Sequence, residues 1–305
     1  MLSGVFPILA TPFAADGAPD VADLRRLIDF IVAAKPDGLV FPGVASEFET
    51  LGADERRWLV DEVDRALSKR VPLVVGVSSA SAAESADLAA QARSLGAAAV
   101  MAMAPGALKD AETGLRDYYR DVAAAGVSVI LQNAPPPIGC GLSPQRVVDV
   151  VKAVPGVEYV KEETMPCGQR ISQLLAAAPV NLRGVFGGAG GRYITDELAR
   201  GACGTMPACE LIDLHVRQFA LHRAGDPRGV RVLFDRMLPL LNFQAVFRMA
   251  MTKEVLRRRG VIEATHVRAA GPKLDAGDMR ELTAMLDDIS DLMPMPTKAA
   301  AHPVT

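Results

Sequence analysis

The sequence predicts a (β/α)8 TIM barrel of the α/β class, followed by a C-terminal three-helix extension. Eight short apolar runs alternate with amphipathic helical patterns through the first 224 residues, and three further helical patterns follow. The runs are apolar at nearly every position, as in parallel strands buried on both faces. Strand–helix alternation repeated eight times is the pattern of a closed α/β barrel.

The predicted strands are mostly entered through Gly or Pro, as at Pro36-Asp37-Gly38 and Ala125-Gly126. These residues are typical of the point where a helix ends and the chain turns into a strand. The eight predicted strands are Gly4–Thr11, Gly38–Gly43, Val71–Val77, Ala97–Met103, Val127–Gln132, Val157–Lys161, Leu182–Phe186 and Cys203–Ala208.

The intervening segments carry apolar residues at helical spacing, such as Leu24, Leu27, Ile28 and Ile31. Ser143-Pro144 combines an N-cap with proline at the first helical position. The predicted barrel helices are Val21–Lys35, Asp54–Leu67, Ser81–Leu95, Ala111–Ala124, Pro144–Ala153, Cys167–Ala177, Arg192–Ala199 and Glu210–His222.

Three regions follow from this pattern: a catalytic barrel over residues 1–224, a helical extension over 225–292 and a tail over 293–305. Three prolines and three consecutive alanines predict that the tail is frayed. The predicted helices of the extension are Arg228–Leu241, Phe243–Arg259 and Ala276–Leu292.

Composition and charge exclude several classes of protein. Hydrophobic residues make up 50% and charged residues 23%, which is typical of a globular protein. The net charge is -3 and the basic residues are scattered, so no nucleic-acid partner is expected. No apolar stretch approaches the roughly 18–20 residues of a membrane span, and the N-terminus lacks the regions of a secretory signal. We therefore expect a cytoplasmic protein.

The active site of such a barrel lies at the carboxyl ends of its strands. Of the eight lysines, only Lys161 ends a predicted strand. Removal from water disfavours the ammonium form and frees a neutral amine, which can attack a ketone and form a Schiff base. The alternative is a structural ion pair of Lys161 with Glu162 or Glu163.

The loop after the seventh strand is rich in glycine. It reads Gly187-Gly188-Ala189-Gly190-Gly191 and precedes the helix predicted from Arg192. Exposed amides at a helix start favour an anion, so Gly187 and Gly188 are candidate substrate-binding residues. Arg192 is a candidate for a distal carboxylate or phosphate. A tight turn and a solvated arginine are the alternatives.

Several segments resemble the dihydrodipicolinate synthase / N-acetylneuraminate lyase family of Schiff-base aldolase barrels. They are the opening Gly4–Phe13, the loop Gly43-x-x-x-Glu47, the segment Gln132-Asn133-Ala134-Pro135 and Val160-Lys161-Glu162. The resemblance implies that Lys161 forms an imine with a 2-keto acid. It also implies that Ala45 and Ser46 receive the substrate carboxylate, and that the protein forms dimers or tetramers.

The departures from the family pattern point to the reaction type. Gln132 stands where a tyrosine normally shuttles protons, and an amide can orient a substrate but cannot act as a general base. This pattern is similar to that of 2-keto-3-deoxy-sugar-acid dehydratases, notably those acting on L-2-keto-3-deoxyarabonate. We expect Ser46, Gln132 and Asn133 to position substrate or water. Glu47 is a candidate base with a structural role as its alternative.

The expected activity is thus that of a lyase without a cofactor or metal, acting on a small 2-keto acid as a dehydratase or aldolase. A synthase-type or N-acetylneuraminate-lyase-type aldolase and a non-catalytic keto-acid sensor remain alternatives. A third is a metal-dependent lyase in which Glu47, Glu163 and Glu210 bind Mg²⁺.

Overall fold

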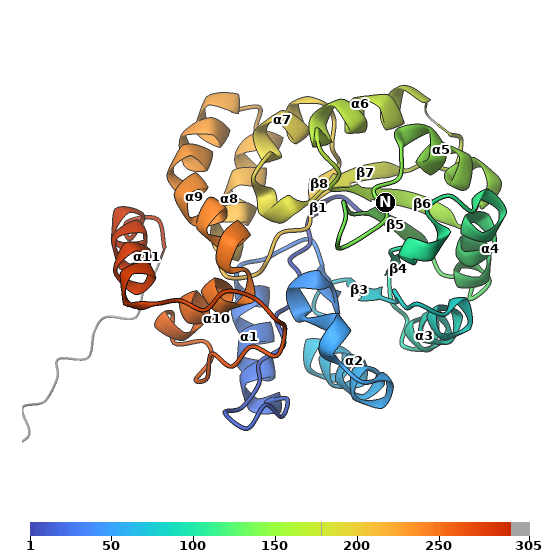
Figure 1. Cartoon of the computed structure of the whole chain (residues 1–305). Coiled ribbons are helices and arrows are strands. Elements are labelled where there is room, and N and C mark those ends of the chain that lie inside the picture. The colour runs from blue at the N-terminus through green and yellow to red at the C-terminus, as the bar shows by residue number, and fades with distance from the viewer. Residues whose placement is uncertain (178, 294–305) are drawn as a thin grey trace, which may run out of the picture.

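The predicted apolar runs form one sheet of eight parallel strands in the computed structural model, which describes residues 1–177 and 179–293 (Figure 1). Neighbouring strands follow one another in the order β1-β8-β7-β6-β5-β4-β3-β2. The strands are β1 (Gly4–Val5), β2 (Leu39–Phe41), β3 (Leu73–Gly76), β4 (Ala99–Ala102), β5 (Val129–Asn133), β6 (Val157–Glu162), β7 (Gly184–Gly187) and β8 (Gly204–Thr205).

The barrel closes between β1 and β2. Ile8 bridges both Val40 and Ala208, and the Val40 amide donates to the Pro7 carbonyl over 2.9 Å. The strand predicted over Gly4–Thr11 is regular only at its first two residues. Pro7 has no amide hydrogen to donate, so the ladder continues beyond it as an isolated bridge.

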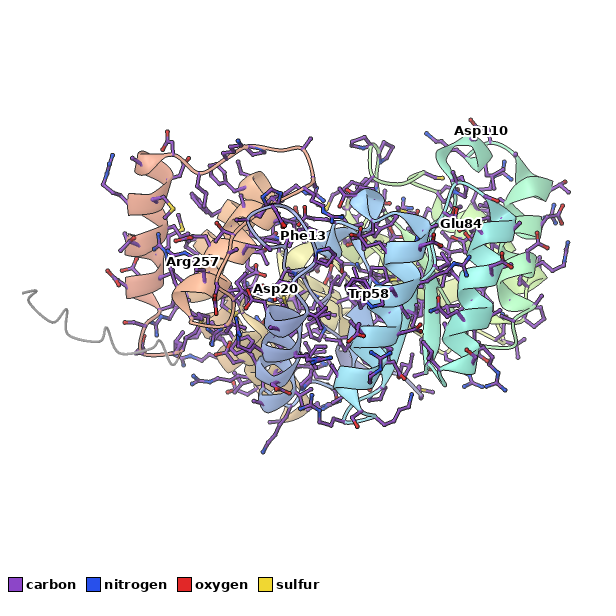
Figure 2. The ribbon with its side chains drawn as sticks, turned by 90° about the horizontal axis from the view of Figure 1, so that it is seen from below. Phe13, Asp20, Trp58, Glu84, Asp110 and Arg257 are labelled. Carbon is purple, nitrogen blue, oxygen red and sulfur yellow. The ribbon has the colours of Figure 1, made fainter. Side chains whose placement is uncertain are left out.

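Helices surround the sheet, as Figure 1 shows. Their first turns face one side of the molecule, marked in Figure 2 by Asp20, the N-cap of α1, and by Glu84 in the first turn of α3. The barrel helices are α1 (Val21–Ala33), α2 (Ala53–Leu67), α3 (Ala82–Ser94), α4 (Glu112–Ala123), α5 (Pro144–Ala153), α6 (Cys167–Ala177), α7 (Ile194–Ala199) and α8 (Ile212–Arg223). These are the eight expected helices, and the fold is the predicted (β/α)8 barrel.

Two apolar layers hold the barrel together. A small cluster that includes Phe6, Tyr159 and Phe186 fills its interior, and a much larger cluster lies between the strands and the helices. Because side chains alternate along a strand, Tyr159 and Lys161 of β6 point inward while Val160 points to the helices. The barrel interior beneath Lys161 is therefore lined with apolar side chains.

The extension consists of α9 (Pro227–Phe247), α10 (Met249–Arg258) and α11 (Ala276–Asp288). The predicted break near Asn242 is wrong, because α9 continues through it and ends at Arg248. The backbone of Arg248 has φ 48° and ψ -122°, a conformation that cannot continue a helix. The tail predicted over 293–305 lies outside the described residues, apart from Met293.

Two ionic contacts, one buried and one partly exposed, fasten the extension to the loop after β2 and to α2. Lys253 of α10 binds Glu47 over 2.6 Å, and Arg268 binds Glu55 of α2 over 2.6 Å. Both cations also lie over the ring of Phe13, which is labelled in Figure 2. The extension thus fixes one wall of the barrel mouth. No helix among residues 1–177 and 179–293 is long and apolar enough to cross a membrane.

Candidate active site

Lys161 lies in the interior of the barrel near the carboxyl end of β6. Its neighbours in the sheet are Gln132 on β5 and Phe186 on β7. Only 2% of its side chain is exposed. It contributes to a cavity of about 160 Å³ whose other walls include Ile8, Ala45 and Met206. The predicted nucleophile therefore lies in the barrel mouth, in a cavity with both apolar and charged walls.

Glu163 is the acidic partner of Lys161 in this cavity. The Lys161 Nζ atom lies 3.2 Å from Glu163 Oε1. Gln132 Nε2 donates to Oε2 over 2.7 Å, and the Ala189 amide donates to Oε1 over 3.0 Å. Both carboxylate oxygens are thus held in place by groups from β5 and from the loop after β7.

The surroundings of Glu163 favour its charged form. Burial alone would raise the pKa of the Glu163 carboxyl, but the Lys161 ammonium, the Gln132 amide and the Ala189 amide outweigh it and lower the pKa. Glu163 is therefore an anion at neutral pH, 3.2 Å from a cation. A proton can pass between the two groups without water.

A second buried acid, Glu197 of α7, lies behind this pair. A Cβ on Gly187 would come within 2.0 Å of Glu197 Oε2, and one on Gly188 within 2.6 Å of Glu163 Oε1. The two glycines therefore form a thin backbone wall between the two acids. Burial, and next the charge of Glu163, raise the pKa of Glu197 to about 8, so its carboxyl is mainly protonated at neutral pH.

Two residues of the loop after β2 line the cavity. They are Val44 and Ala45, which begin the 3-10 turn η1 (Val44–Ser46). Within the described residues, neither amide has an acceptor. The Ser46 hydroxyl donates to the Leu9 carbonyl over 2.5 Å and accepts from the Gly43 amide. Ser46 therefore braces the loop and does not line the cavity, contrary to the expectation that it contacts substrate.

Glu47 is likewise directed away from Lys161. Its Oε1 binds Lys253 over 2.6 Å, and its Oε2 accepts the amides of Arg268 and Ala269. Glu47 and Lys253 are fully buried in this pair, with side-chain exposures of 0%. The carboxylate thus joins the barrel to the extension, which is the structural alternative named for it and not the base role.

Asn133 has its polar atoms engaged within the protein. Its side-chain amide donates to Glu162 Oε2 over 2.9 Å and to the Leu142 carbonyl, while its oxygen accepts the Leu142 amide. Glu162 also forms an ion pair with Arg170. Asn133 and Glu162 point to the helix side of the sheet, opposite to Gln132 and Lys161. Asn133 therefore holds the loop after β5 instead of lining the cavity.

The glycine loop binds a carboxylate that belongs to the protein itself. The Ala189 amide, in the turn η4 (Ala189–Gly191), binds the Glu163 carboxylate. Gly187 and Gly188 make room for the acids beside them and are not among the residues that line the Lys161 cavity. Arg192 does line that cavity and is half-buried.

Sequence reasoning named Glu163 only as an ion-pair partner or metal ligand. The available signal was its spacing: residues i and i+2 of a strand share a face, which places Glu163 beside Lys161. Arg248 was missed altogether, although it lines the same cavity. Within the described chain, no three acidic, histidine or cysteine side chains gather as metal ligands. Glu47, Glu163 and Glu210 are thus not brought together.

Comparison with known proteins agrees with this architecture. The model of the dihydrodipicolinate synthetase family matches residues 1–288. A 4-hydroxy-tetrahydrodipicolinate synthase of Ralstonia nicotianae is 34% identical over 183 residues, a match that spans 60% of this chain and 62% of that protein. An L-2-keto-3-deoxyarabonate dehydratase of Azospirillum brasilense is 28% identical and is matched over 95% of both chains.

Solved structures give the same result. The dihydrodipicolinate synthase of Rhodopseudomonas palustris superposes with a TM-score of 0.86 at 27% identity, over 94% of this chain and 97% of that one. A prophage protein of Escherichia coli, solved with pyruvate, shares the fold with the same score at 23% identity, over 95% and 99% of the two chains. With its sheet closed around Lys161 and the family pattern running from the first strand into the last helix, this chain belongs to the dihydrodipicolinate synthetase family.

Proposed function

We propose that this lyase of the dihydrodipicolinate synthetase family is a dehydratase of a 2-keto-3-deoxy sugar acid. In this proposal Lys161 forms the Schiff base and Glu163 moves the protons. The observation that carries it is the contact of 3.2 Å between Lys161 Nζ and Glu163 Oε1 at a lysine that is almost fully buried. A carboxylate at this place supplies the base that Gln132, as an amide, cannot supply.

The reaction begins at the keto carbon. Glu163 takes a proton from Lys161, and the neutral amine attacks C2. Glu163 then returns this proton as the keto oxygen leaves as water, which gives a protonated imine and an anionic Glu163. The imine withdraws electrons from C3, so Glu163 can take a C3 proton and an enamine forms. The C4 hydroxyl then leaves with that proton as a second water. Hydrolysis of the remaining imine consumes one water and frees Lys161, for a net loss of one water.

The basicity of Glu163 rises during the proposed reaction because the positive charge beside it disappears. In the resting site the Lys161 ammonium lowers the pKa of Glu163. When the C3 proton leaves, the positive imine becomes a neutral enamine, and the stabilisation of the Glu163 anion is lost. Its carboxyl then holds the proton more firmly until the leaving hydroxyl accepts it.

The substrate carboxylate has a separate place in this proposal. The free amides of Val44 and Ala45 border the Lys161 cavity, and paired backbone amides suit an anion. Gln132 fixes Glu163 through its Oε2 atom and is thereby a positioning residue. Ser46, Glu47, Asn133, Gly187 and Gly188 support these groups through the contacts described above.

An aldolase is the second candidate, because the similarity to 4-hydroxy-tetrahydrodipicolinate synthases carries the higher identity. The same imine would then accept electrons from cleavage of the C3–C4 bond, with Glu163 taking the C4 hydroxyl proton. The full-length match to a dehydratase favours the first candidate. Assembly into dimers or tetramers and a cytoplasmic location remain predictions.

Borohydride trapping tests the proposal. Incubation with 2-keto-3-deoxyarabonate or pyruvate, reduction and peptide mapping should find an adduct on Lys161. Lys161→Ala should yield none, while Lys152→Ala should behave as the parent protein. Product analysis of the untreated reaction separates dehydration from retro-aldol cleavage. Adduct formation with no turnover of any 2-keto-3-deoxy acid would favour a sensor, and full activity of Lys161→Ala would refute the mechanism.

A further inference from the structure

Two arginines without acidic partners border the Lys161 cavity. Arg192 follows the glycine loop, and Arg248 separates α9 from α10; both are among the lining residues. Within residues 1–177 and 179–293, neither makes an ion pair. Other arginines near the barrel mouth do: Arg170 meets Glu162, and Arg268 meets Glu55.

The Arg192 guanidinium lies over the glycine loop. A Cβ on Gly190 would lie 3.2 Å from Arg192 Nη1 and 3.3 Å from Gln244 Oε1. Gly190 has φ 68°, so the chain turns sharply beneath these two groups. The half-buried guanidinium is therefore held against the loop whose Ala189 amide binds Glu163, at the rim of the cavity.

Arg248 is presented by an unusual backbone. Its φ of 48° and ψ of -122° lie in a region that glycine favours, yet the position carries a long cation. Its amide still donates to the Gln244 carbonyl over 2.7 Å, and its carbonyl accepts the Thr252 amide. The strained junction thus keeps Arg248 at the border between the Lys161 cavity and a larger one of about 890 Å³. Backbone strain of this kind concentrates at functional sites.

The charges that line the Lys161 cavity do not balance. They are those of Lys161, Glu163, Arg192 and Arg248, and the first two neutralise each other. A keto acid would place its first carboxylate on the amides of Val44 and Ala45. Two guanidinium charges then remain unmatched, and guanidinium groups bind carboxylate and phosphate with paired hydrogen bonds.

We infer that the substrate is a 2-keto-3-deoxy acid with a second anionic group, a carboxylate or a phosphate, at the end remote from the keto carbon. Arg192 and Arg248 bind that group. This inference rests on the proposed function and narrows its substrate class. A sugar acid that ends in a neutral hydroxyl leaves both cations unpaired.

Three six-carbon substrates that differ only at C6 test the inference: 2-keto-3-deoxygluconate, its 6-phosphate and 2-keto-3-deoxyglucarate. We expect kcat/KM for at least one anionic substrate to exceed that of the neutral-ended one about tenfold or more. Preference for the phosphate or for the diacid identifies the anion. Equal rates for all three, or preference for the neutral end, would overturn the inference.

Variants assign the effect to the two side chains. Arg192→Gln and Arg248→Gln should each raise KM for the preferred anionic substrate about tenfold more than KM for the neutral-ended substrate. Arg228→Gln, which alters an exposed arginine at the start of α9, is the matched control. Equal losses for all three substrates would contradict a distal anion site.

Borohydride trapping of pyruvate separates this inference from the proposed function. Pyruvate has no distal group, so Arg192→Gln and Arg248→Gln should form the Lys161 adduct as the parent protein does. A parent protein that fails to trap pyruvate refutes the Schiff-base proposal. One that traps pyruvate but shows no preference among the C6 variants refutes only the distal site.

Discussion

Lys161 and Glu163, two residues apart on the same strand end, share a contact of 3.2 Å within the barrel mouth. In the proposed mechanism, the pair brings a nucleophile and a proton acceptor together in a chain that has Gln132 at the position of the family's tyrosine. Gln132, which occupies the position of that tyrosine, holds the Glu163 carboxylate instead. In the proposed mechanism, proton transfer therefore depends on a carboxylate at the end of β6 and not on a phenol on β5.

Glu163→Gln should separate imine formation from dehydration. The amide preserves the size and one hydrogen-bond acceptor of the side chain but cannot accept the C3 proton. Because Glu163 also takes the Lys161 proton, we expect the pyruvate adduct on Lys161 to form more slowly but still to accumulate, while kcat for dehydration falls about 10²- to 10⁴-fold. The exposed Glu112 supplies a control, since Glu112→Gln should leave kcat unchanged. Retention of kcat in Glu163→Gln would assign the base to another group.

Gln132→Leu should change the pH dependence of the reaction. Burial raises the pKa of Glu163, and Lys161, Gln132 and the Ala189 amide lower it. Removing the Gln132 hydrogen bond therefore raises this pKa, and the acidic limb of the kcat/KM profile moves to higher pH. Leucine nearly preserves the side-chain volume. Gln132→Glu places a second carboxylate beside Glu163 and should move the limb further in the same direction. If the acidic limb of the kcat/KM profile stays at the same pH in both variants, the ionisation of Glu163 does not control that limb.

The barrel and the position of Lys161 in its interior were predictable because they depend on local patterns. An apolar run of strand length and a lysine at its end can both be read within a few residues. The roles of Ser46 and Glu47 depend on distant partners: Leu9 for the serine, and Lys253, 206 positions away, for the glutamate. No periodicity of the sequence encodes such pairs.

The sequence around Glu163 does not show how its carboxylate is oriented, because two other segments of the chain orient it. Its carboxylate is oriented by Gln132 of β5 and by the Ala189 amide after β7. The glycines of that loop were interpreted from sequence as an anion site or a tight turn. The loop does turn tightly at Gly190, where φ is 68°, and Gly187 and Gly188 also leave space for Glu163 and Glu197. A glycine in the sequence indicates that a neighbouring group needs the space that a side chain would fill. The sequence does not show which group that is.

Glu197→Gln should remove a pH-dependent loss of stability. Burial raises the pKa of Glu197 from 4.5 to about 8 in the folded protein. Between these values the folded state binds more protons than the unfolded state, so the free energy of unfolding falls as pH rises. The loss is on the order of a few kcal/mol. Urea unfolding from pH 5 to pH 8 should show a flatter profile in Glu197→Gln, whereas exposed Glu281→Gln should follow the parent protein.

Lys253→Met should weaken the attachment of the extension to the barrel. The variant leaves Glu47 buried without its cation, and breaking one partner of a buried pair costs about 3–5 kcal/mol. The double variant Glu47→Gln/Lys253→Met removes the unpaired charge and should recover part of the loss. Urea unfolding measures both free energies. If the double variant is as unstable as the single one, packing of the lysine stem and not charge accounts for the effect.

Val44→Pro tests the carboxylate site without changing a charge. Gly43 is extended, with φ -140° and ψ -170°, and Val44 is the first residue of a 3-10 turn, so proline is compatible with both positions. The substitution removes one amide donor from the cavity. Since a hydrogen bond to a charged group contributes about 1.5–3 kcal/mol, the pyruvate concentration for half-maximal trapping should rise at least tenfold. Val44→Ala keeps the amide and should trap pyruvate normally. If Val44→Pro melts at the parent temperature and binds pyruvate with unchanged affinity, the carboxylate lies elsewhere.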